Sequence, residues 1–495
     1  MFRWFKKEEP AQGDKRSAPA VTRQEENSKR PSLDYTLHEF KNCADLLQHT
    51  FPEIEVTLVY FGHMVGNAEL ERDVIVPLTH VHHDHIDELL QRTQYVETNS
   101  QKKLIEGVLD GKVALFHEKR AFLVDVYGPP ARSISESETE TIIVGPHDAF
   151  VESSGTNLSL IRRRVKSSHL KTIKLSVGEI SKTTVYLLYI EDLANKQLVE
   201  EIKKRIKNVE FDAIIETHML IQCIDESPNS IFPQFITTER PDTAASKLFD
   251  GKIIGIMDGT PTVFSAPTGF LEFFQSPDDY SQRWILATLT RFLRFGALLI
   301  TLFFTSLYVA ITTYHYEMIP ENMLVTLAKS RSRVPFPPIY EALFLEITIE
   351  LLREAAARLP TKIGQTIGIV GGIVIGQAAV QAGFTSNILI IVVAISALAS
   401  FVIPNYLMTA SIRVARFALI LLAAWFGNFG LAVGIAFMII HLAGLTTLGT
   451  PYLLPAAPIY ISDWKDTFIR APYYLITKRS HQSKTDNMIR NKMRE

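Results

Sequence analysis

The pattern of apolar and polar positions divides the chain into a mixed α/β region followed by an apolar region. Up to about residue 282, short β-branched apolar runs alternate with segments in which apolar residues recur every three or four positions. The short runs predict strands, and the periodic segments predict amphipathic helices. Strands are expected at 54–61, 74–78, 113–116, 122–127, 172–177, 184–190, 213–216 and 253–257, and helices at 86–92, 102–109 and 195–209.

The second region contains two long uncharged runs. Residues 363–412 and 417–462 contain no Asp, Glu, Lys or Arg, and runs of that length are typical of membrane spans. Breaks near Gly383, Pro404 and Gly427 divide the two runs into four spans. The predicted fold is therefore an α/β soluble N-terminal region with two subdomains, followed by an all-α polytopic membrane domain.

Composition sets the expected boundaries of these parts. The first residues are rich in Lys, Arg, Glu, Ser and Pro, which is typical of a flexible tail. The end of the chain carries more Lys and Arg than Asp and Glu, which favours a cytoplasmic tail. No internal sequence repeat is apparent. The expected domains are a flexible tail at 1–32, an α/β subdomain at 33–145, and a second α/β subdomain with a membrane-proximal collar at 146–282. A membrane domain of four to six helices plus an acidic amphipathic helix at 339–359 is expected at 283–460, and a basic cytoplasmic tail at 461–495.

One charged helix, predicted at 339–359, precedes the first uncharged run. Glu346, Glu350, Arg353 and Glu354 fall within an arc of about 100° on this helix, and apolar residues occupy the other side. In an oligomer, one such acidic stripe from each chain would line a cation path around the axis. These four residues are the first candidates for an ion path.

Glycines recur every four residues in the segment that follows this helix. Gly364, Gly368, Gly372 and Gly376 form a small-xxx-small ladder, which lets helices approach closely in lipid. The ladder predicts a tightly packed helix beside the charged one.

Two arrangements of the charged helix remain open. A first span at 295–314, entered through Arg283, Arg291 and Arg294, favours a cytoplasmic N-side. With four further spans, the basic tail would lie outside unless helix 339–359 also crosses, and its length of about 31 Å is sufficient. Alternatively, the helix lies flat at the interface and one apolar hairpin is re-entrant.

A histidine-rich motif in the soluble region offers a different chemistry. His80, His82, Asp84 and His85 spell H-x-H-x-D-H after an expected strand, which resembles the dinuclear metal signature of metallo-β-lactamases. His147 could supply a third histidine, but residues 162–172 offer no bridging aspartate. A His-rich polar loop is the simpler interpretation, so no metal or other cofactor is expected.

Composition excludes several function classes. A formal charge of −2 gives no reason to expect nucleic-acid binding. Cys43 and Cys223 suggest buried thiols in a reducing compartment, and the N-terminus lacks an apolar signal segment. No catalytic triad, phosphate loop or dinucleotide fingerprint is present, which favours a channel, transport or receptor role over an enzyme.

Several long motifs resemble the A subunit of GerA-type spore germinant receptors. They are SIFPQFITTERPD, GKIIGIMDGTP, QSPDDY, RVPFPPIYEALFLEITIELLREAAARLP, GQTIGIVGGIVIGQAAVQAG and FVIPNY, and the resemblance extends over roughly residues 100–460. The His80–His85 run is not part of the family pattern.

The resemblance implies a multi-pass protein of the spore inner membrane with both termini in the cytoplasm. It implies a permease-like B subunit, a lipoprotein C subunit and further A subunits as partners, within membrane lipid. The A subunits would form a nutrient-gated channel that releases monovalent cations early in germination. Glu346, Glu350, Arg353 and Glu354 are carried over as family residues, and Val370 and Val374 as a narrow apolar lining. The alternatives are a GerA-like germination amplifier without nutrient sensing and, more remotely, a membrane-tethered metallohydrolase.

Overall fold

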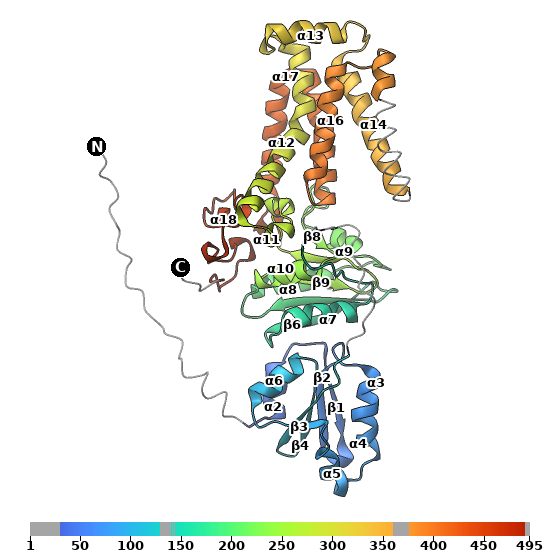
Figure 1. Ribbon diagram of the computed structural model, residues 1–495, viewed down its shortest axis with the longest axis vertical. Helices are drawn as coiled ribbons and strands as arrows, with labels where there is room; N and C mark the ends of the chain where they lie inside the picture. Colours follow the sequence, from blue (N-terminus) through green and yellow to red (C-terminus); the bar gives the residue numbers. More distant parts are fainter. Residues whose placement is uncertain (1–29, 129–139, 141, 143, 360–375, 491–495) are drawn as a thin grey trace, which may run out of the picture. The chain divides into compact units, whose positions relative to one another are not determined.

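The computed structural model describes residues 30–128, 140, 142, 144–359 and 376–490 (Figure 1). The chain divides into two compact units. The first is Met1–Ala131 with Lys166–Ser168, and the second is Arg132–Val165 with His169–Glu495. The second unit contains both an α/β part and a helical bundle, and each unit is described separately.

The first unit is built on a five-stranded antiparallel sheet. Its strand order is β1-β2-β4-β5-β3, so the third strand in the sequence lies at an edge. The strands are β1 (Leu46–Phe51), β2 (Val56–Phe61), β3 (Tyr95–Glu97), β4 (Val113–His117) and β5 (Arg120–Val124). The helices are α2 (Leu33–Glu39), α3 (Asn67–Leu70), α4 (Val76–His80), α5 (Ile86–Leu90) and α6 (Gln101–Leu109).

Both faces of this sheet are covered, because its inner strand β2 carries apolar residues on both sides. Val56, Leu58 and Tyr60 belong to a core shared with α3, α4 and α5, whereas Val59 and Phe61 belong to a core shared with α2 and α6. Alternate residues of a strand point to opposite faces, so one continuous apolar run supplies two cores. Figure 1 shows α2 and α6 on one side of the sheet and α3 and α4 on the other.

The α/β part of the second unit has a sheet of the same kind. Its order is β6-β7-β9-β10-β8, with every pair antiparallel. The strands are β6 (Leu170–Val177), β7 (Thr183–Ile190), β8 (Ile236–Thr238), β9 (Ile253–Met257) and β10 (Val263–Ala266). The helices α8 (Lys196–Lys207) and α9 (Thr217–Ile224) share one core, and α7 (Ser154–Arg164) and α10 (Pro241–Phe249) share the other.

The two α/β parts repeat one order of elements. In each, a helix precedes two strands, helical segments lead to an edge strand, one further helix follows, and two central strands complete the sheet. The expected fold class, two α/β subdomains followed by a helical region, is confirmed. The repeat itself is visible only in the structure.

Two of the expected strands are wrong. Residues 74–78 are helical and end in α4, because Val74 and Leu78 are both buried and lie four residues apart, which is the helical period. Residues 213–216 form no strand; they connect to α9, and Ile214 packs into the core while Ile215 is exposed.

The helical bundle begins directly after the second sheet. The short α11 (Asp278–Ser281) leads into the long α12 (Trp284–Tyr314), which begins before the expected span at 295–314. The remaining bundle helices are α13 (Glu321–Arg331), α14 (Pro338–Arg358), α16 (Asn387–Val402) and α17 (Tyr406–Gly444). After the bundle come two two-residue strands, β11 (Thr446–Thr447) and β12 (Thr450–Pro451), and then α18 (Trp464–Thr467).

Helix α17 is two antiparallel arms joined at Gly427. Gly427 has φ 60° and ψ −140°, a conformation essentially restricted to glycine. A Cβ built on Gly430 would lie 2.1 Å from the carbonyl oxygen of Leu422, and one on Gly434 would lie 2.6 Å from Leu419. The small residues therefore let the second arm fold back against the first, as the predicted break at this position requires.

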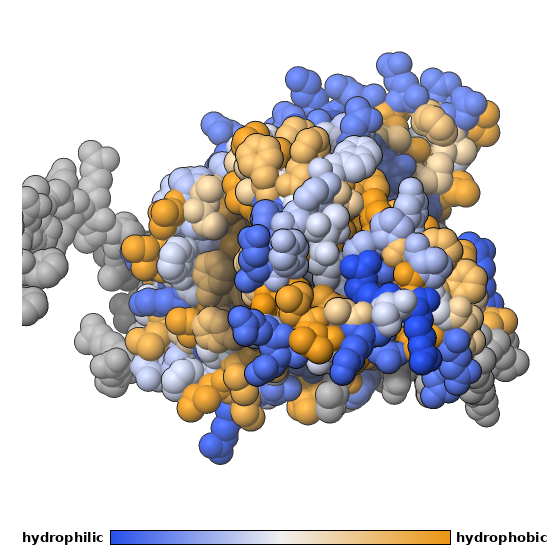
Figure 2. Space-filling view, turned by 90° about the horizontal axis from the view of Figure 1, so that it is seen from above, coloured by the Kyte–Doolittle hydropathy of each residue, from blue (hydrophilic) through white to orange (hydrophobic). Residues whose placement is uncertain are grey.

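The bundle exposes many apolar side chains. Among the described residues, α12 and α17 are long and apolar enough to cross a membrane by length and composition, and α16 is a shorter apolar helix. The end that carries α13 mixes hydrophilic and hydrophobic side chains in the view from above (Figure 2). Exposed apolar residues on the bundle include Leu289, Phe292, Leu293, Leu398, Phe401, Phe429, Phe437 and Ile440.

Candidate functional site

Helix α14 runs along the bundle beside α12 and α16. Near its start, Glu341 Oε2 accepts a hydrogen bond of 3.0 Å from the backbone of Ser386, which precedes α16. Near its end, Arg353 donates to Ser400 at 2.9 Å. Contacts thus progress in the same direction along α14 and α16, so these helices are parallel. The described part of the charged helix lies within the bundle rather than flat across one end of it.

Five charged side chains meet where α14 crosses α17, and they are called the charged cluster here. They are Glu346, Glu350 and Arg353 from α14 and Arg413 and Arg416 from α17. Arg416 Nη2 lies 2.6 Å from Glu346 Oε2, and both side chains have no exposed surface. Glu350 is within 3.0 Å of Arg353, 3.2 Å of Arg413 and 3.4 Å of Arg416.

Hydroxyl groups from two more helices complete the cluster. Thr305 of α12 donates to Glu346 at 2.8 Å, and Arg416 donates to Ser396 of α16 at 3.0 Å. Arg353 also stacks 4.9 Å above the ring of Phe401. Buried charges persist only when they are paired and hydrogen-bonded, and here four helices supply those partners.

The predicted acidic stripe therefore has three different environments. Glu346 is fully buried, Glu350 is 26% exposed, and Glu354 is 60% exposed and pairs with Arg358 one turn further on. Three arginines face two glutamates in the cluster, so it is not an acidic surface in this conformation. The role of the stripe as an ion path stays a prediction.

Sequence reasoning did not identify the arginine partners, although a signal was present. Arg413 and Arg416 are the only charged residues between the two uncharged runs 363–412 and 417–462. Charged residues isolated in apolar segments usually face a polar partner inside the bundle. Glu341 was missed as well: it is buried and lies 3.3 Å from Arg331 of α13.

The glycine ladder is described only at its end. Gly364, Gly368, Val370, Gly372 and Val374 lie outside the described residues. A Cβ at Gly376 would meet no atom of the described residues within 4 Å, so no described neighbour requires a glycine there.

The histidine motif lies in the first unit, on the surface. His80, His82 and His85 are exposed, and His85 lies 3.5 Å from Glu88; Asp84 falls in the same short helical turn. Within the described residues, no group of three or more His, Cys, Asp or Glu side chains could hold a metal ion.

A second set of buried charges joins the start of α12 to its surroundings. Asp279 of α11 accepts from Arg291 at 2.9 Å and from Arg294 at 2.8 Å. Arg291 also lies 3.4 Å from Asp466 in the C-terminal segment. Burial raises the pKa of Tyr280, which stays protonated and donates to Asp466. Helix α11, the first turns of α12 and the C-terminal segment are therefore held at one point.

The segment 230–235, which precedes β8, also contacts the bundle. Ser230 Oγ lies 3.0 Å from His441 Nε2 on the second arm of α17, and Phe232 packs 6.0 Å from the same imidazole. Tyr452 donates to the carbonyl of Pro233. His441 is thus a packing and hydrogen-bonding residue at the base of the bundle.

The chain was compared with known proteins. A family model described as Bacillus/Clostridium GerA spore germination protein matches residues 34–482. Spore germination protein GerQA of Bacillus cereus is 45% identical, over 79% of this chain and 79% of its own length. Spore germination protein A1 of Bacillus subtilis is 39% identical, over 84% of this chain and 87% of its own.

Two further similarities extend this result. The uncharacterized membrane protein YfkQ of Bacillus subtilis is 38% identical, over 85% of this chain and 84% of its own length. The N-terminal domain of the A subunit of the Bacillus megaterium germinant receptor GerK3 is 26% identical, with a TM-score of 0.39, over 49% of this chain and 97% of that structure. None of these names describes an enzyme. The chain belongs to the Bacillus/Clostridium GerA family of spore germination proteins.

Proposed function

We propose that this protein is the A subunit of a nutrient germinant receptor, and that several copies form a nutrient-gated channel for monovalent cations in the spore inner membrane. The observation that carries the proposal is the charged cluster, which is buried between helices that expose many apolar side chains. Ionisable groups inside apolar spans are costly to maintain and typically mark ion paths, relays or switch elements.

We assign the conformation described here to the closed state of that channel. Glu346 and Glu350 form ion pairs with arginines, so neither carboxylate is free to bind a passing cation. Helix α14 leads directly into residues 360–375, where Val370 and Val374 are the proposed narrow lining. A displacement of α17 relative to α14 would change which arginines of α17 pair with the glutamates of α14. In this proposal the same displacement would move the lining at Val370 and Val374.

The contacts at the base of the bundle provide a mechanical connection from the soluble part to this switch. Asp279 holds Arg291 and Arg294, and α12 then continues to Thr305, which bonds Glu346. A movement at α11 would reach α14 through one rigid helix. The contacts at α11 and the charged cluster would both act on helix α12. Two sites are physically coupled when they bias one shared structural element in this way.

The proposal includes partners and an orientation. A permease-like B subunit and a lipoprotein C subunit would complete the receptor, and the exposed apolar residues of α12, α16 and α17 would face these partners, other A subunits and lipid. The C-terminal segment contacts the first turns of α12 through Asp466. We propose that both termini lie on the cytoplasmic side.

Spores that carry single substitutions would test the proposal. Val370→Glu or Val374→Glu is expected to produce cation leak without nutrient. Gly376→Leu is expected to block nutrient-triggered cation release, because we propose that Gly376 faces a neighbouring subunit. Gly296→Leu on α12 is the matched control, because a Cβ there also meets no atom within 4 Å of this chain. Normal cation release and normal germination in all three variants would refute the pore assignment.

A further inference from the structure

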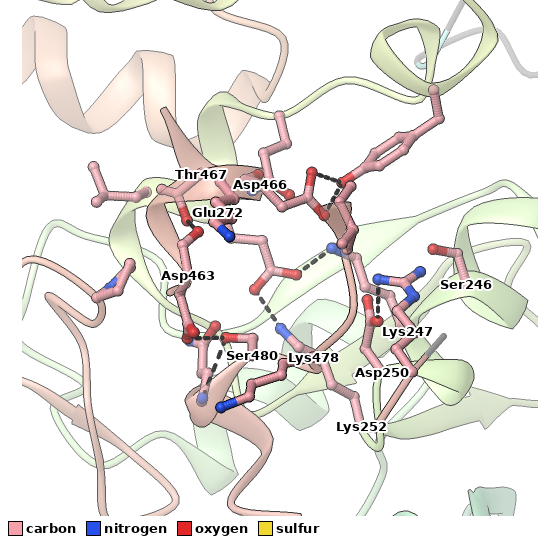
Figure 3. Close-up of a pocket in the computed structure, with 18 of the residues that line it drawn as sticks. Ser246, Lys247, Asp250, Lys252, Glu272, Asp463, Asp466, Thr467, Lys478 and Ser480 are labelled. Carbon is pink, nitrogen blue, oxygen red and sulfur yellow. Dashed lines mark hydrogen bonds and ion pairs between the residues drawn. The ribbon is translucent and has the colours of Figure 1, made fainter. Parts of the chain in front are cut away.

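A polar pocket lies in the second unit, between the second α/β part and the C-terminal segment. Its volume is about 550 Å³. Its walls come from α10 and the turn after it, from residues 271–281 ahead of α12, and from residues 454–490 (Figure 3). This pocket is called the collar pocket, and no step of the channel proposal uses it.

Lysines outnumber their carboxylate partner at the centre of the collar pocket. Lys247 and Lys252 both donate to the carboxylate of Glu272, which lies between them (Figure 3). The side chains of Lys247, Lys252 and Glu272 are 13%, 4% and 8% exposed. Two ammonium groups therefore share one carboxylate away from water, so this group of three carries a net positive charge.

The protonation of these groups follows from that arrangement. Burial alone would raise the pKa of Glu272, but the two lysines lower it to about 2, so the carboxylate stays ionised. Burial lowers the pKa of Lys252 despite its contact with Glu272. An additional anion beside Lys252 would stabilise its charged form.

Other carboxylates of the pocket wall already have partners. Asp463 accepts from the backbone of His481 at 2.8 Å and from Ser480 at 3.2 Å. Asp250 lies 2.8 Å from Arg490, and Asp466 accepts from the Tyr280 hydroxyl at 3.1 Å. Arg490 and Arg291 balance the charges of Asp250 and Asp466, whereas the hydrogen-bond donors to Asp463 are neutral. Asp250 also favours the charged form of Lys252.

Lys478 adds to the positive charge that faces the pocket. It lines the same space, and its ammonium group makes no hydrogen bond or ion pair with any residue the structure describes. An ammonium group is a point charge that suits tetrahedral phosphate oxygens. The hydroxyls of Thr243 and Ser246 line the same wall and could add neutral donors.

We propose that the collar pocket binds a phosphate group, with Lys247, Lys252 and Lys478 as its cationic partners. The phosphate could belong to a small soluble anion or to an anionic lipid headgroup, because both present the same oxygens. The bound group would link α10, which belongs to the soluble part, to the C-terminal segment that contacts α12 through Asp466. The site is independent of the channel proposal, because binding can be measured without ion flux.

The test uses the full chain purified in detergent and titrated with inorganic phosphate, with thermal unfolding and calorimetry as readouts. Lys478→Gln is expected to weaken phosphate binding about tenfold, through loss of one charge-assisted hydrogen bond. Lys478 is exposed, so the variant should fold. Lys247→Gln is a second variant, since Glu272 keeps its bond to Lys252. Lys204→Gln on α8, an exposed lysine outside the pocket, is the control with the same loss of charge.

A second arm distinguishes the two sources of phosphate. The same four proteins are placed in nanodiscs of phosphatidylglycerol or of phosphatidylcholine, and unfolding temperatures are compared. Lys478-dependent stabilisation by inorganic phosphate supports a soluble ligand, and Lys478-dependent stabilisation by phosphatidylglycerol alone supports a headgroup. If neither probe depends on Lys478 or Lys247 more than on Lys204, the proposal is overturned.

Discussion

The buried pair Glu346–Arg416 should be strongly coupled, and the two single substitutions should differ in cost. Arg416→Met removes the cation and leaves the Glu346 carboxylate fully buried, where the Thr305 hydroxyl is its remaining hydrogen-bond partner among the described residues. Loss of one member of a buried pair costs about 3–5 kcal/mol. We expect Arg416→Met to lower the free energy of unfolding by that amount.

Glu346→Gln should be milder, because Arg416 keeps other partners. The arginine would still donate to Ser396 at 3.0 Å and lie 3.4 Å from Glu350, and a glutamine could still accept from Thr305. The expected cost is about 1–2 kcal/mol, close to that of one hydrogen bond to a charged group. In the double variant no charge is left unpaired, so its cost should resemble that of Glu346→Gln alone.

A double-mutant cycle by SDS-driven unfolding in mixed micelles would measure the coupling energy, which we expect to be at least about 2 kcal/mol. The matched control is a cycle on Glu354 and Arg358 of the same helix, whose side chains are 60% and 77% exposed. An exposed pair at this spacing should couple by only about 0.3–0.5 kcal/mol. Equal coupling in the two cycles, or additive effects at Glu346 and Arg416, would refute the reasoning.

Three further predictions follow from other parts of the second unit. Gly427→Ala should destabilise the α17 hairpin by about 1–3 kcal/mol, because its backbone conformation excludes a Cβ, and a lower unfolding temperature of the full chain would show it. Asp279→Asn should cost about 1.5–3 kcal/mol, because Arg291 and Arg294 lose a charged hydrogen-bond partner while Arg291 keeps Asp466 at 3.4 Å; unchanged thermal unfolding would contradict this. Burial raises the pKa of Glu140 from 4.5 to about 7, so the folded state holds this proton longer than the unfolded state and loses stability as pH rises through that interval. Glu140→Gln, which can still accept from Thr238, should therefore stabilise the chain by about 1–3 kcal/mol at pH 8 and not at pH 4.5, as measured by thermal unfolding at both values.

Local periodicity predicted the elements whose buried residues are close in sequence. Helix α14 was expected at 339–359 and is observed at Pro338–Arg358, because its apolar and charged sides follow the helical period. The prediction of a strand at 74–78 was wrong. Val74 and Leu78 are buried at helical spacing, but the apolar run that contains them is short. Such a short run has too few positions to distinguish the helical period from the alternation of a strand.

Contacts between distant segments could not be predicted in the same way. The partners of Glu346 come from α12 and α17, and their spacing in the sequence contains no information about that pairing. The common strand order of the two sheets is equally hidden, because it depends on which strands lie side by side. The collar pocket was missed because Glu272 and Lys478 belong to segments about two hundred residues apart.

The measurement that tests the central claim most directly is cation flux from proteoliposomes that contain the complete receptor, with and without its nutrient. We expect nutrient-dependent release of monovalent cations, altered by Val370→Glu and unaffected by Gly296→Leu. Release that is independent of nutrient, or equal for Val370→Glu and the unsubstituted protein, would contradict the assignment of this chain as the pore-forming subunit.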